Sequence, residues 1–106
     1  MAKYDPGEYV EAVLDLVERI PAGHVMSYGA IAEYLALRFG RGSARRVGTI
    51  MARHGAAVPW HRVVTANGRT PPGHEKRAHD LLTREGVTFR GANVDMATHA
   101  WFPADR

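Results

Sequence analysis

The sequence contains no cysteine among its 106 residues. It therefore forms no disulfides, offers no thiolate ligand to a metal ion, and lacks the sulfur nucleophile that some transfer reactions require. Long hydrophobic runs are missing as well, since no apolar stretch approaches the roughly 18 residues of a membrane span. The first residues, MAKYDPGEY, do not resemble a signal peptide. We therefore expect a cytoplasmic protein with no membrane contact.

Length and composition are typical of one small folded unit. Hydrophobic residues make up 45% of the chain and charged residues 24%, which are ordinary globular values and argue against a wholly disordered chain. A chain of 106 residues can bury one hydrophobic core but not two independent ones. We expect a single domain over residues 1–106.

Charge is unevenly distributed along the chain. The net charge is +3, but residues 19–62 hold seven arginines against Glu33 alone, a balance of +6. Residues 1–18 have a balance of −4 and residues 63–106 of +1. A basic segment is typical of a surface that binds a polyanion, and arginine suits contacts with phosphates and bases. The alternative is an ordinary solvated surface.

Capping signals predict three helices in the first half. The first begins after Asp5 with Pro6 at its first position, the second begins after Ser27, and the third begins after Ser43. Gly40-Arg41-Gly42 separates the last two. The residues expected to face the core are Val10, Val13, Leu14 and Val17, then Ile31, Ala32 and Leu35, then Val47, Ile50 and Met51. Helices two and three match a helix-turn-helix, with an ordinary helical hairpin as the alternative.

The second half contains shorter elements. Residues 55–64 lack helical periodicity, Asn67-Gly68 predicts a tight turn, and residues 70–73 form a rigid proline-rich loop. A fourth helix is expected over residues 74–85, with Ala78, Leu81 and Leu82 inward and Gly86 as its stop. Residues 87–89 are expected to form a short strand, and the aromatic side chains of residues 101–102 to pack on the core.

Four motifs occur in a particular order. They are Ile20-Pro21-Ala22-Gly23 with Ser27-Tyr28-Gly29, Arg45-Arg46-Val47-Gly48, Pro59-Trp60-His61-Arg62-Val63, and Leu81-Leu82 with Glu85-Gly86. Together they resemble the C-terminal DNA-binding domain of O6-alkylguanine-DNA alkyltransferases over nearly the whole chain. In those enzymes the residue between Pro and His is the alkyl-accepting cysteine, whereas here it is Trp60. The chain therefore resembles the non-enzymatic, alkyltransferase-like branch of that family.

This resemblance implies a fold and a function. The expected fold is mainly α, a winged-helix-like helix-turn-helix DNA-binding domain with a short β-hairpin. The expected function is to bind O6-alkylguanine in double-stranded DNA by flipping the nucleotide into a pocket, without alkyl transfer. The chain would flag the lesion for the damage-recognition proteins of nucleotide excision repair. We expect no cofactor, a monomer, and association with the nucleoid if the source is bacterial.

The resemblance also assigns roles around the pocket. His61 and Glu85 match the network that activates the thiolate in the enzymes, so here they form a network without a nucleophile. An indole nitrogen is a donor without an accessible lone pair, so Trp60 cannot replace the thiolate. Trp60 would instead offer aromatic surface to the alkyl group, with a core aromatic as the alternative. Arg62 is expected to anchor the loop.

Further residues are assigned to DNA. Arg45 matches an arginine finger that fills the space left by the flipped nucleotide, while Arg46 would attract phosphate. Tyr28 matches a tyrosine that presses on the target phosphate and lines the site. Ser43 is a helix cap in a position that also allows a phosphate bond. Arg69 either points at the base or lies on the surface.

The chain departs from the enzymes at two loops. The stretch from Arg45 to Trp60 is slightly shorter, with His54-Gly55-Ala56 in place of an Asn-Pro turn. The loop from Arg69 to Gly73 is short and proline-rich, which leaves the outer wall of the pocket undefined.

Two other kinds of function fit the sequence less well. A helix-turn-helix transcription regulator needs base-reading side chains, and the third helix offers mainly small residues at Ala44, Gly48, Thr49 and Ala52. A histidine metal site is disfavoured because His74 and His79 are five residues apart and so do not share a helix face. We therefore expect no metal.

Overall fold

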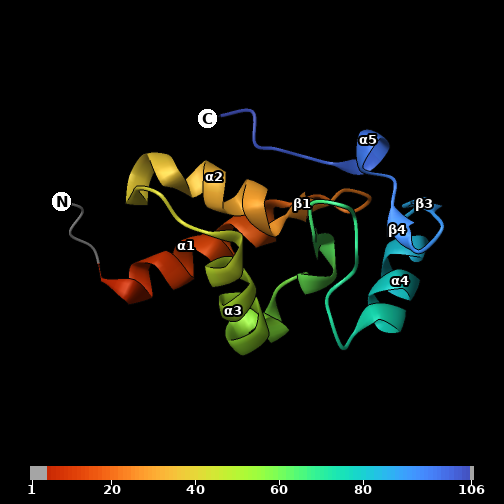
Figure 1. Ribbon diagram of the computed structural model, residues 1–106, viewed down its shortest axis with the longest axis horizontal. Helices are drawn as coiled ribbons and strands as arrows, with labels where there is room; N and C mark the ends of the chain where they lie inside the picture. Colours follow the sequence, from red (N-terminus) through yellow and green to blue (C-terminus); the bar gives the residue numbers. More distant parts are fainter. Residues whose placement is uncertain (1–4, 106) are drawn as a thin grey trace.

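A computed structural model describes residues 5–105 of the protein (Figure 1). Its elements, in chain order, are α1 (Pro6–Arg19), β1 (Met26–Ser27), α2 (Tyr28–Phe39), α3 (Ala44–His54), the 3₁₀ turns η1 (Gly55–Ala57) and η2 (Trp60–Arg62), β2 (Val63–Val64), α4 (Glu75–Arg84), β3 (Phe89–Arg90), β4 (Asn93–Val94) and α5 (Met96–His99). The predicted class, a mainly helical domain with short strands, is confirmed. None of the described helices is long and apolar enough to cross a bilayer.

The elements form two groups along the longest dimension, which measures 43 Å. Helices α1, α2 and α3 pack against one another at one end, and α4 with the β3–β4 hairpin lies at the other (Figure 1). The turns η1 and η2 connect α3 to α4 across the middle of the molecule. Each group has its own cluster of buried side chains.

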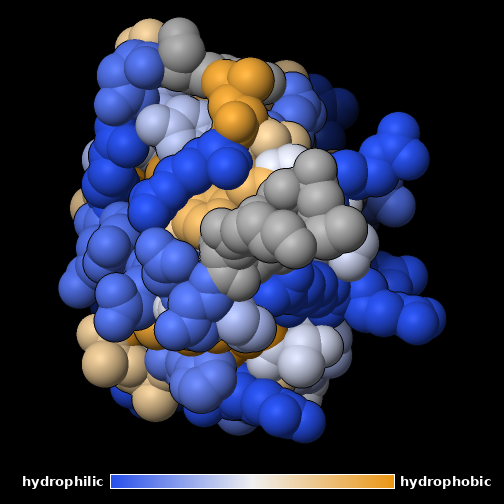
Figure 2. All heavy atoms as spheres, turned by 90° about the vertical axis from the view of Figure 1, so that its left-hand side faces the viewer, coloured by the Kyte–Doolittle hydropathy of each residue, from blue (hydrophilic) through white to orange (hydrophobic). Residues whose placement is uncertain are grey.

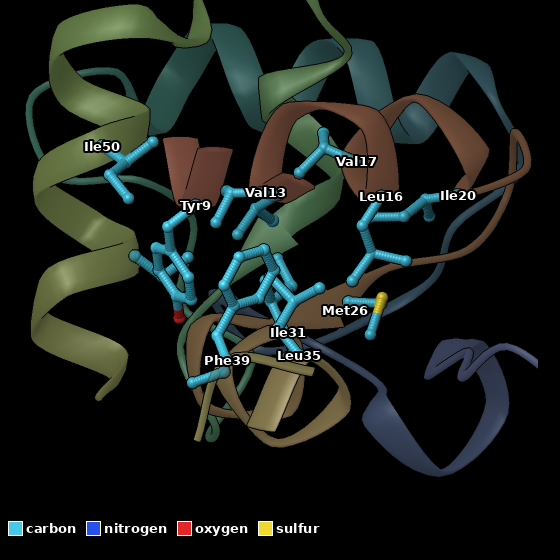
Figure 3. Close-up of a cluster of buried hydrophobic side chains, with 13 residues drawn as sticks. Tyr9, Val13, Leu16, Val17, Ile20, Met26, Ile31, Leu35, Phe39 and Ile50 are labelled. Carbon is cyan, nitrogen blue, oxygen red and sulfur yellow. The ribbon is translucent and has the colours of Figure 1, made fainter. Parts of the chain in front are cut away.

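The larger cluster lies among the first three helices (Figure 3). Its largest side chains include Tyr9, Leu16, Ile31, Leu35 and Phe39, and the Tyr9 and Phe39 rings meet edge to face with centroids 5.2 Å apart. The second cluster consists of Val25, Val64, Leu82, Val87 and Val94. Burial of these apolar side chains holds the two groups together around β1 and β2.

Helix α1 begins at the predicted cap. The Asp5 carboxylate accepts the Gly7 N–H at 2.9 Å, and the Glu8 carboxylate accepts the Asp5 N–H at 3.0 Å, which completes a capping box. The predicted buried stripe is only partly correct. The buried residues are Tyr9, Val13, Leu16 and Val17, whereas Val10 and Leu14 are partly buried. The stripe is rotated because Tyr9 packs beneath α2 and α3.

The helix-turn-helix has the predicted boundaries. Ser27 accepts the Ala30 N–H at 3.0 Å at the start of α2, and Gly40 ends α2 with a φ of +81° that favours glycine. Gly42 lies against Tyr9, where an added Cβ would stand 2.7 Å from the hydroxyl oxygen. The inward residues of α2 are buried as expected, and so are those of α3 except for Met51, which is partly buried.

The four short strands form two separate pairs, one parallel and one antiparallel. β1 and β2 form a parallel pair in which Met26 faces Val63, although 36 residues separate them in the chain. The hairpin is formed instead by β3 and β4, with Phe89 opposite Val94. The strand expected over residues 87–89 is thus shifted to Phe89–Arg90, because the Val87 N–H is used by the Leu82 carbonyl at the end of α4.

The turn at Asn67-Gly68 forms as predicted, and the Gly68 N–H donates to the Thr65 carbonyl at 2.9 Å. The aromatic tail packs on the core only in part. Trp101 is partly buried against the larger cluster, whereas Phe102 remains 37% exposed and contacts the edge of Tyr34.

Candidate nucleic-acid interface

Ser43 fixes the start of α3, the second helix of the helix-turn-helix. Its hydroxyl oxygen accepts the Arg46 N–H at 3.1 Å, so this side chain is used as a cap while its residue stays exposed. The predicted cap is therefore confirmed. Because the first backbone N–H groups of a helix point outward from its start, this end of α3 favours an anionic group such as phosphate.

Arg45 and Arg46 differ in their surroundings. The Arg46 guanidinium lies over the Tyr9 ring, 4.3 Å from its centroid, so this arginine packs back onto α1. Arg45 is exposed, and its guanidinium makes no hydrogen bond or ion pair with any of residues 5–105. Only its carbonyl is engaged, by the Thr49 hydroxyl at 3.2 Å. Arg45 is thus the arginine of this pair that is available to a ligand.

Tyr28 stands at the first position of α2 and faces α3. A Cβ built on Gly48 would lie 3.9 Å from the Tyr28 Cδ1, an ordinary contact distance, so the Tyr28 ring lies beside Gly48 of α3. Desolvation raises the pKa of the Tyr28 hydroxyl, which therefore stays protonated and can donate a hydrogen bond at neutral pH. The structure thus places Tyr28 beside α3.

Glu85, at the end of α4, joins three segments of the chain. Its carboxylate lies 2.8 Å from His61 Nε2 and 2.8 Å from an Arg62 terminal nitrogen, and it accepts the Gly23 N–H at 3.0 Å. Arg62 also donates to the Ile20 carbonyl at 2.9 Å. The predicted contact between His61 and Glu85 is present, and the predicted anchoring role of Arg62 is confirmed.

The ionisation of Glu85 follows from these partners. Burial by itself raises its pKa, but the hydrogen bonds from Arg62, His61 and the Gly23 N–H outweigh burial and lower the pKa to about 2. Glu85 is therefore a carboxylate at every physiological pH. It holds the imidazole of His61 in one orientation, directly beside Trp60.

His99 supports the same turn from the other side and was missed by the sequence analysis. Its Nε2 accepts the Thr88 N–H at 3.0 Å, so its Nδ1 carries the proton and donates to the Gly23 carbonyl at 2.9 Å. Gly23 is thereby bonded through its N–H to Glu85 and through its carbonyl to His99. Only the folded contact between distant segments reveals this role, because a lone histidine in the tail carries no local signal.

Trp60 is half-buried and stands between two imidazoles. Its ring meets that of His61 with centroids 6.0 Å apart at 85°, and that of His74 with centroids 5.6 Å apart at 60°. Both are edge arrangements that aromatic rings favour. Trp60 is therefore not a fully buried core aromatic, and His74 is a neighbour that the motif did not indicate.

Arg69 lies at the end of the turn that follows β2. Its N–H donates to the Thr65 hydroxyl at 2.9 Å, and its side chain is exposed. Within residues 5–105, no hydrogen bond joins Arg69 to Tyr28 or Trp60. Two open hollows of the described surface lie elsewhere, one on α4 around Leu81 and one between α1 and α2. The structure thus does not show Tyr28, Trp60 and Arg69 lining one closed pocket.

The surface around the helix-turn-helix is largely hydrophilic. Figure 2 shows the end of the molecule that carries the start of α1 and the end of α2, where hydrophilic side chains cover most of the face. Arg38, Arg41, Arg45 and Arg53 are exposed on or beside α2 and α3. No three His, Asp or Glu side chains among residues 5–105 are grouped so that they could hold a metal ion. His79 instead stacks on Phe89, with centroids 4.0 Å apart.

Comparison with known proteins connects this arrangement to a family. The family model described as the 6-O-methylguanine DNA methyltransferase, DNA binding domain, matches residues 8–87. The chain belongs to this family. Its matched part includes the helix-turn-helix, Trp60 and the Glu85 network.

Individual relatives place the chain within the alkyltransferase-like part of the family. It is 33% identical over 99 residues to the DNA base-flipping protein of Escherichia coli, covering 88% of this chain and 74% of that protein. It is 40% identical over 86 residues to alkyltransferase-like protein 1 of Schizosaccharomyces pombe, covering 76% and 77%.

Solved structures of related proteins have a similar fold. S. pombe Atl1 in complex with damaged DNA containing O6-carboxymethylguanine superposes with a TM-score of 0.76 at 31% identity, covering 94% of this chain and all of that one. The O6-methylguanine methyltransferase of Mycobacterium tuberculosis gives a TM-score of 0.62 at 29% identity, covering 80% of this chain and 56% of that one.

The protein is therefore an alkyltransferase-like protein of the base-flipping type. Because the alkyltransferase-like chain has Trp60 where the enzymes have their acceptor, and no cysteine anywhere, it is non-catalytic. The alternative of a transcription regulator loses its support, since the helix-turn-helix occurs here as part of the methyltransferase DNA-binding domain.

Proposed function

We propose that this alkyltransferase-like protein binds double-stranded DNA containing O6-alkylguanine and receives the lesion, flipped out of the helix, beside Trp60. No group is transferred, and the bound lesion is passed to the damage-recognition proteins of nucleotide excision repair. The observation that carries the proposal is Trp60 in the acceptor position next to an intact network of His61, Arg62 and Glu85.

The chemistry of the site supports binding over reaction. Alkyl transfer needs a thiolate, and the indole of Trp60 provides only a donor N–H and an aromatic face. Flipping a nucleotide costs a few kcal/mol, and less where a lesion has weakened the base pair. A site that only binds therefore gains some selectivity for damaged pairs without chemistry. The aromatic face of Trp60 adds apolar contact for the O6 substituent.

The residues of α2 and α3 have separate proposed roles. Arg45 is the arginine finger, supported by its exposed guanidinium without a partner among the described residues. Its flat guanidinium can stack on bases and hydrogen-bond the unpaired partner base. Tyr28 presses on the target phosphate beside α3, Arg46 attracts phosphate from its place over Tyr9, and Ser43 combines capping with a phosphate bond.

The remaining assignments depend on DNA binding itself. We propose that Arg69 contacts the flipped base, supported by its exposure on the turn after β2. We also propose a monomer in which residues 1–106 act as one domain. Since the proposed ligand is chromosomal DNA, the proposed location is the cytoplasm, at the nucleoid if the source is bacterial.

A binding measurement tests the function. The dissociation constants for a duplex with one O6-methylguanine and for the matched undamaged duplex are compared at one fixed salt concentration, because phosphate contacts make affinity strongly salt-dependent. We expect tighter binding to the damaged duplex, reduced by Trp60→Ala. Mass analysis of the protein after incubation should show no added methyl group. Equal affinities for the two duplexes would leave only nonspecific binding.

A further inference from the structure

An open groove runs between α1 and α2 and has a volume of about 380 Å³. The apolar part of its lining comes from Ala12 and Leu16 of α1 and from Leu35 and Leu37 of α2. Leu37 is 72% exposed, more than any other large hydrophobic side chain of residues 5–105. Because burial of such a side chain against another protein is favourable, this α1–α2 groove has the character of a contact surface.

The arginines that line the groove are each matched by a carboxylate. At the end of α1, the Asp105 carboxylate accepts a hydrogen bond from Arg19 at 3.0 Å and one from the Tyr34 hydroxyl at 3.1 Å. Arg19 also donates to the Tyr34 hydroxyl oxygen at 3.3 Å, so this network joins both helices to the tail. Near the other end, Arg38 lies 4.0 Å from Glu8. The groove therefore has no surplus of positive charge.

The rim that α1 contributes to the groove is acidic. Asp15 lines the groove, and Glu11 and Glu18 stand four residues before it and three residues after it, on the same exposed side of the helix. None of these three carboxylates forms an ion pair with another residue of the described chain. The apolar groove is therefore bordered by negative charge that a ligand can match.

The groove lies on the opposite side of α1 and α2 from α3. In Figure 1, α3 extends below α1, whereas the end of the chain lies above α2. Asp105 of this end lines the groove together with Tyr34, so the groove is on the side of the tail. Its negative rim repels the phosphate backbone. A complex that holds DNA through Arg45 of α3 therefore leaves the groove open to a protein.

We propose that the α1–α2 groove is the docking site for a damage-recognition protein of nucleotide excision repair. The inference rests on the proposed function and names the surface used to pass the lesion on. The docking segment is a helix with an apolar side chain that enters the groove beside Leu37, and with lysine or arginine residues that face Glu11, Asp15 and Glu18. A protein that itself binds DNA carries basic surface of this kind, so its charge matches the acidic rim.

The test measures how the repair protein joins the DNA-bound complex. Because the chain has no cysteine, Ala92→Cys in the exposed turn between β3 and β4 accepts a single fluorophore. The labelled protein is saturated with a duplex that carries one O6-methylguanine. The purified damage-recognition protein of the same organism is then added in steps at one salt concentration, and the rise in fluorescence anisotropy gives its dissociation constant.

Two variants remove the two kinds of contact that the groove offers. Leu37→Ala is expected to weaken docking of the repair protein by about tenfold, through loss of buried apolar surface. Asp15→Asn is expected to weaken it by about threefold, and by less at high salt, because a surface charge is screened. Neither variant should change the affinity for the O6-methylguanine duplex by more than about twofold, since both side chains lie away from α3.

Each variant has a matched control in the hollow on α4. There Leu81→Ala shortens an apolar side chain and Asp80→Asn removes one negative charge. Neither control should change docking of the repair protein. Thermal unfolding of every variant confirms that it remains folded.

The outcomes separate this proposal from the proposed function. Unchanged docking in Leu37→Ala and Asp15→Asn contradicts the role of the groove alone, and so does an equal loss in the α4 controls. Sedimentation of the free protein examines another occupant, since a wild-type dimer that Leu37→Ala dissociates would assign the groove to a second copy of the chain.

Two further outcomes concern the proposed function. A wild-type protein that prefers the damaged duplex but binds no repair protein contradicts the transfer of the lesion, and the docking site with it. Equal affinities for damaged and undamaged duplexes contradict lesion recognition, and docking is then measured on the undamaged duplex with the same variants.

Discussion

Among single residues, the neighbouring pair Arg45 and Arg46 gives the sharpest contrast. The sequence motif alone selected Arg45 by register, and the structure adds a physical reason, since Arg46 is placed over the Tyr9 ring while Arg45 is exposed. One arginine is therefore available for DNA, and the other is partly used by the fold. Arg45 and Arg46 are neighbours in the chain, but removing their guanidinium groups should have different effects on DNA binding and on stability.

Arg45→Ala should cost about 1–3 kcal/mol in affinity for the O6-methylguanine duplex, the scale of one specific arginine–base contact, and leave the free energy of unfolding unchanged. Arg46→Ala should lower the free energy of unfolding by about 0.5–1 kcal/mol through loss of the contact with Tyr9, and weaken damaged and undamaged DNA alike. Binding isotherms with both duplexes and urea titrations measure these effects. If both variants lost lesion preference equally, the register of the finger would be wrong.

The sequence predicted the roles of single residues correctly where one motif pattern contained both the residue and its contact partner. His61, Glu85 and Arg62 could be predicted as a network because they occur in one motif pattern. The neighbours of His74 and His99 could not be predicted, since His74 contacts Trp60 and His99 bonds Gly23, both outside their own local patterns. The grouping of Arg69 with Trp60 that the resemblance implies is not seen, since the Arg69 side chain is exposed on the turn after β2.

At the scale of elements, the turn after β2 is held against the hairpin by a glycine. Gly68 has a φ of +90°, and its carbonyl accepts the Val94 N–H at 2.8 Å. A Cβ built there would lie 2.5 Å from the Val94 carbonyl oxygen. Any side chain at this position must therefore push β4 away from the turn that carries Arg69.

Gly68→Ala should destabilise the protein by more than the roughly 1–2 kcal/mol that a left-handed conformation alone costs a residue with a Cβ. Gly86→Ala is the matched control, because Gly86 has a φ of +89° and open space around its Cβ position. It should show the conformational cost without the steric clash. Urea unfolding of the two variants compares them directly. Equal losses would show that the contact with β4 is unimportant.

Elements with local signals were predicted well. The caps at Asp5, Ser27 and Ser43 placed the helix starts correctly, because a capping side chain and the N–H that it accepts are two or three residues apart. The strands were not placed correctly, since pairing of Met26 with Val63 depends on the packed fold and leaves no local pattern. The α1 stripe was rotated for the same reason, as Tyr9 is buried only by its distant partners.

At the scale of the whole molecule, Glu85 links the larger helical cluster to α4. Its carboxylate bonds the loop after α1 through Gly23, and through Arg62 it reaches the Ile20 carbonyl. Stability of the whole fold should therefore depend on its charge. Because its pKa in the folded protein, about 2, lies below its ordinary value of 4.5, its contribution is complete above pH 4.5.

That contribution, on the order of 3 kcal/mol, should be lost as the pH falls from 4.5 toward 2. Urea unfolding at several pH values in this window measures the loss. Glu85→Gln should be less stable at neutral pH and should lack this part of the acid dependence, whereas Glu11→Gln, on the exposed face of α1, should retain it. An unchanged acid dependence in Glu85→Gln would assign the loss to other groups.

The support of Gly23 by His99 also bears on biosynthesis. The Gly23 carbonyl is bonded by His99, Val25 bonds both His99 and Trp101 through its backbone, and the same turn delivers its N–H to Glu85. In a chain growing on the ribosome, the bonds made by His99 and Trp101 cannot form until residues 99–101 have been synthesised. The bond from Gly23 to Glu85 does not depend on these residues, so the support of this turn is completed in two stages during synthesis, and its His99 side comes second.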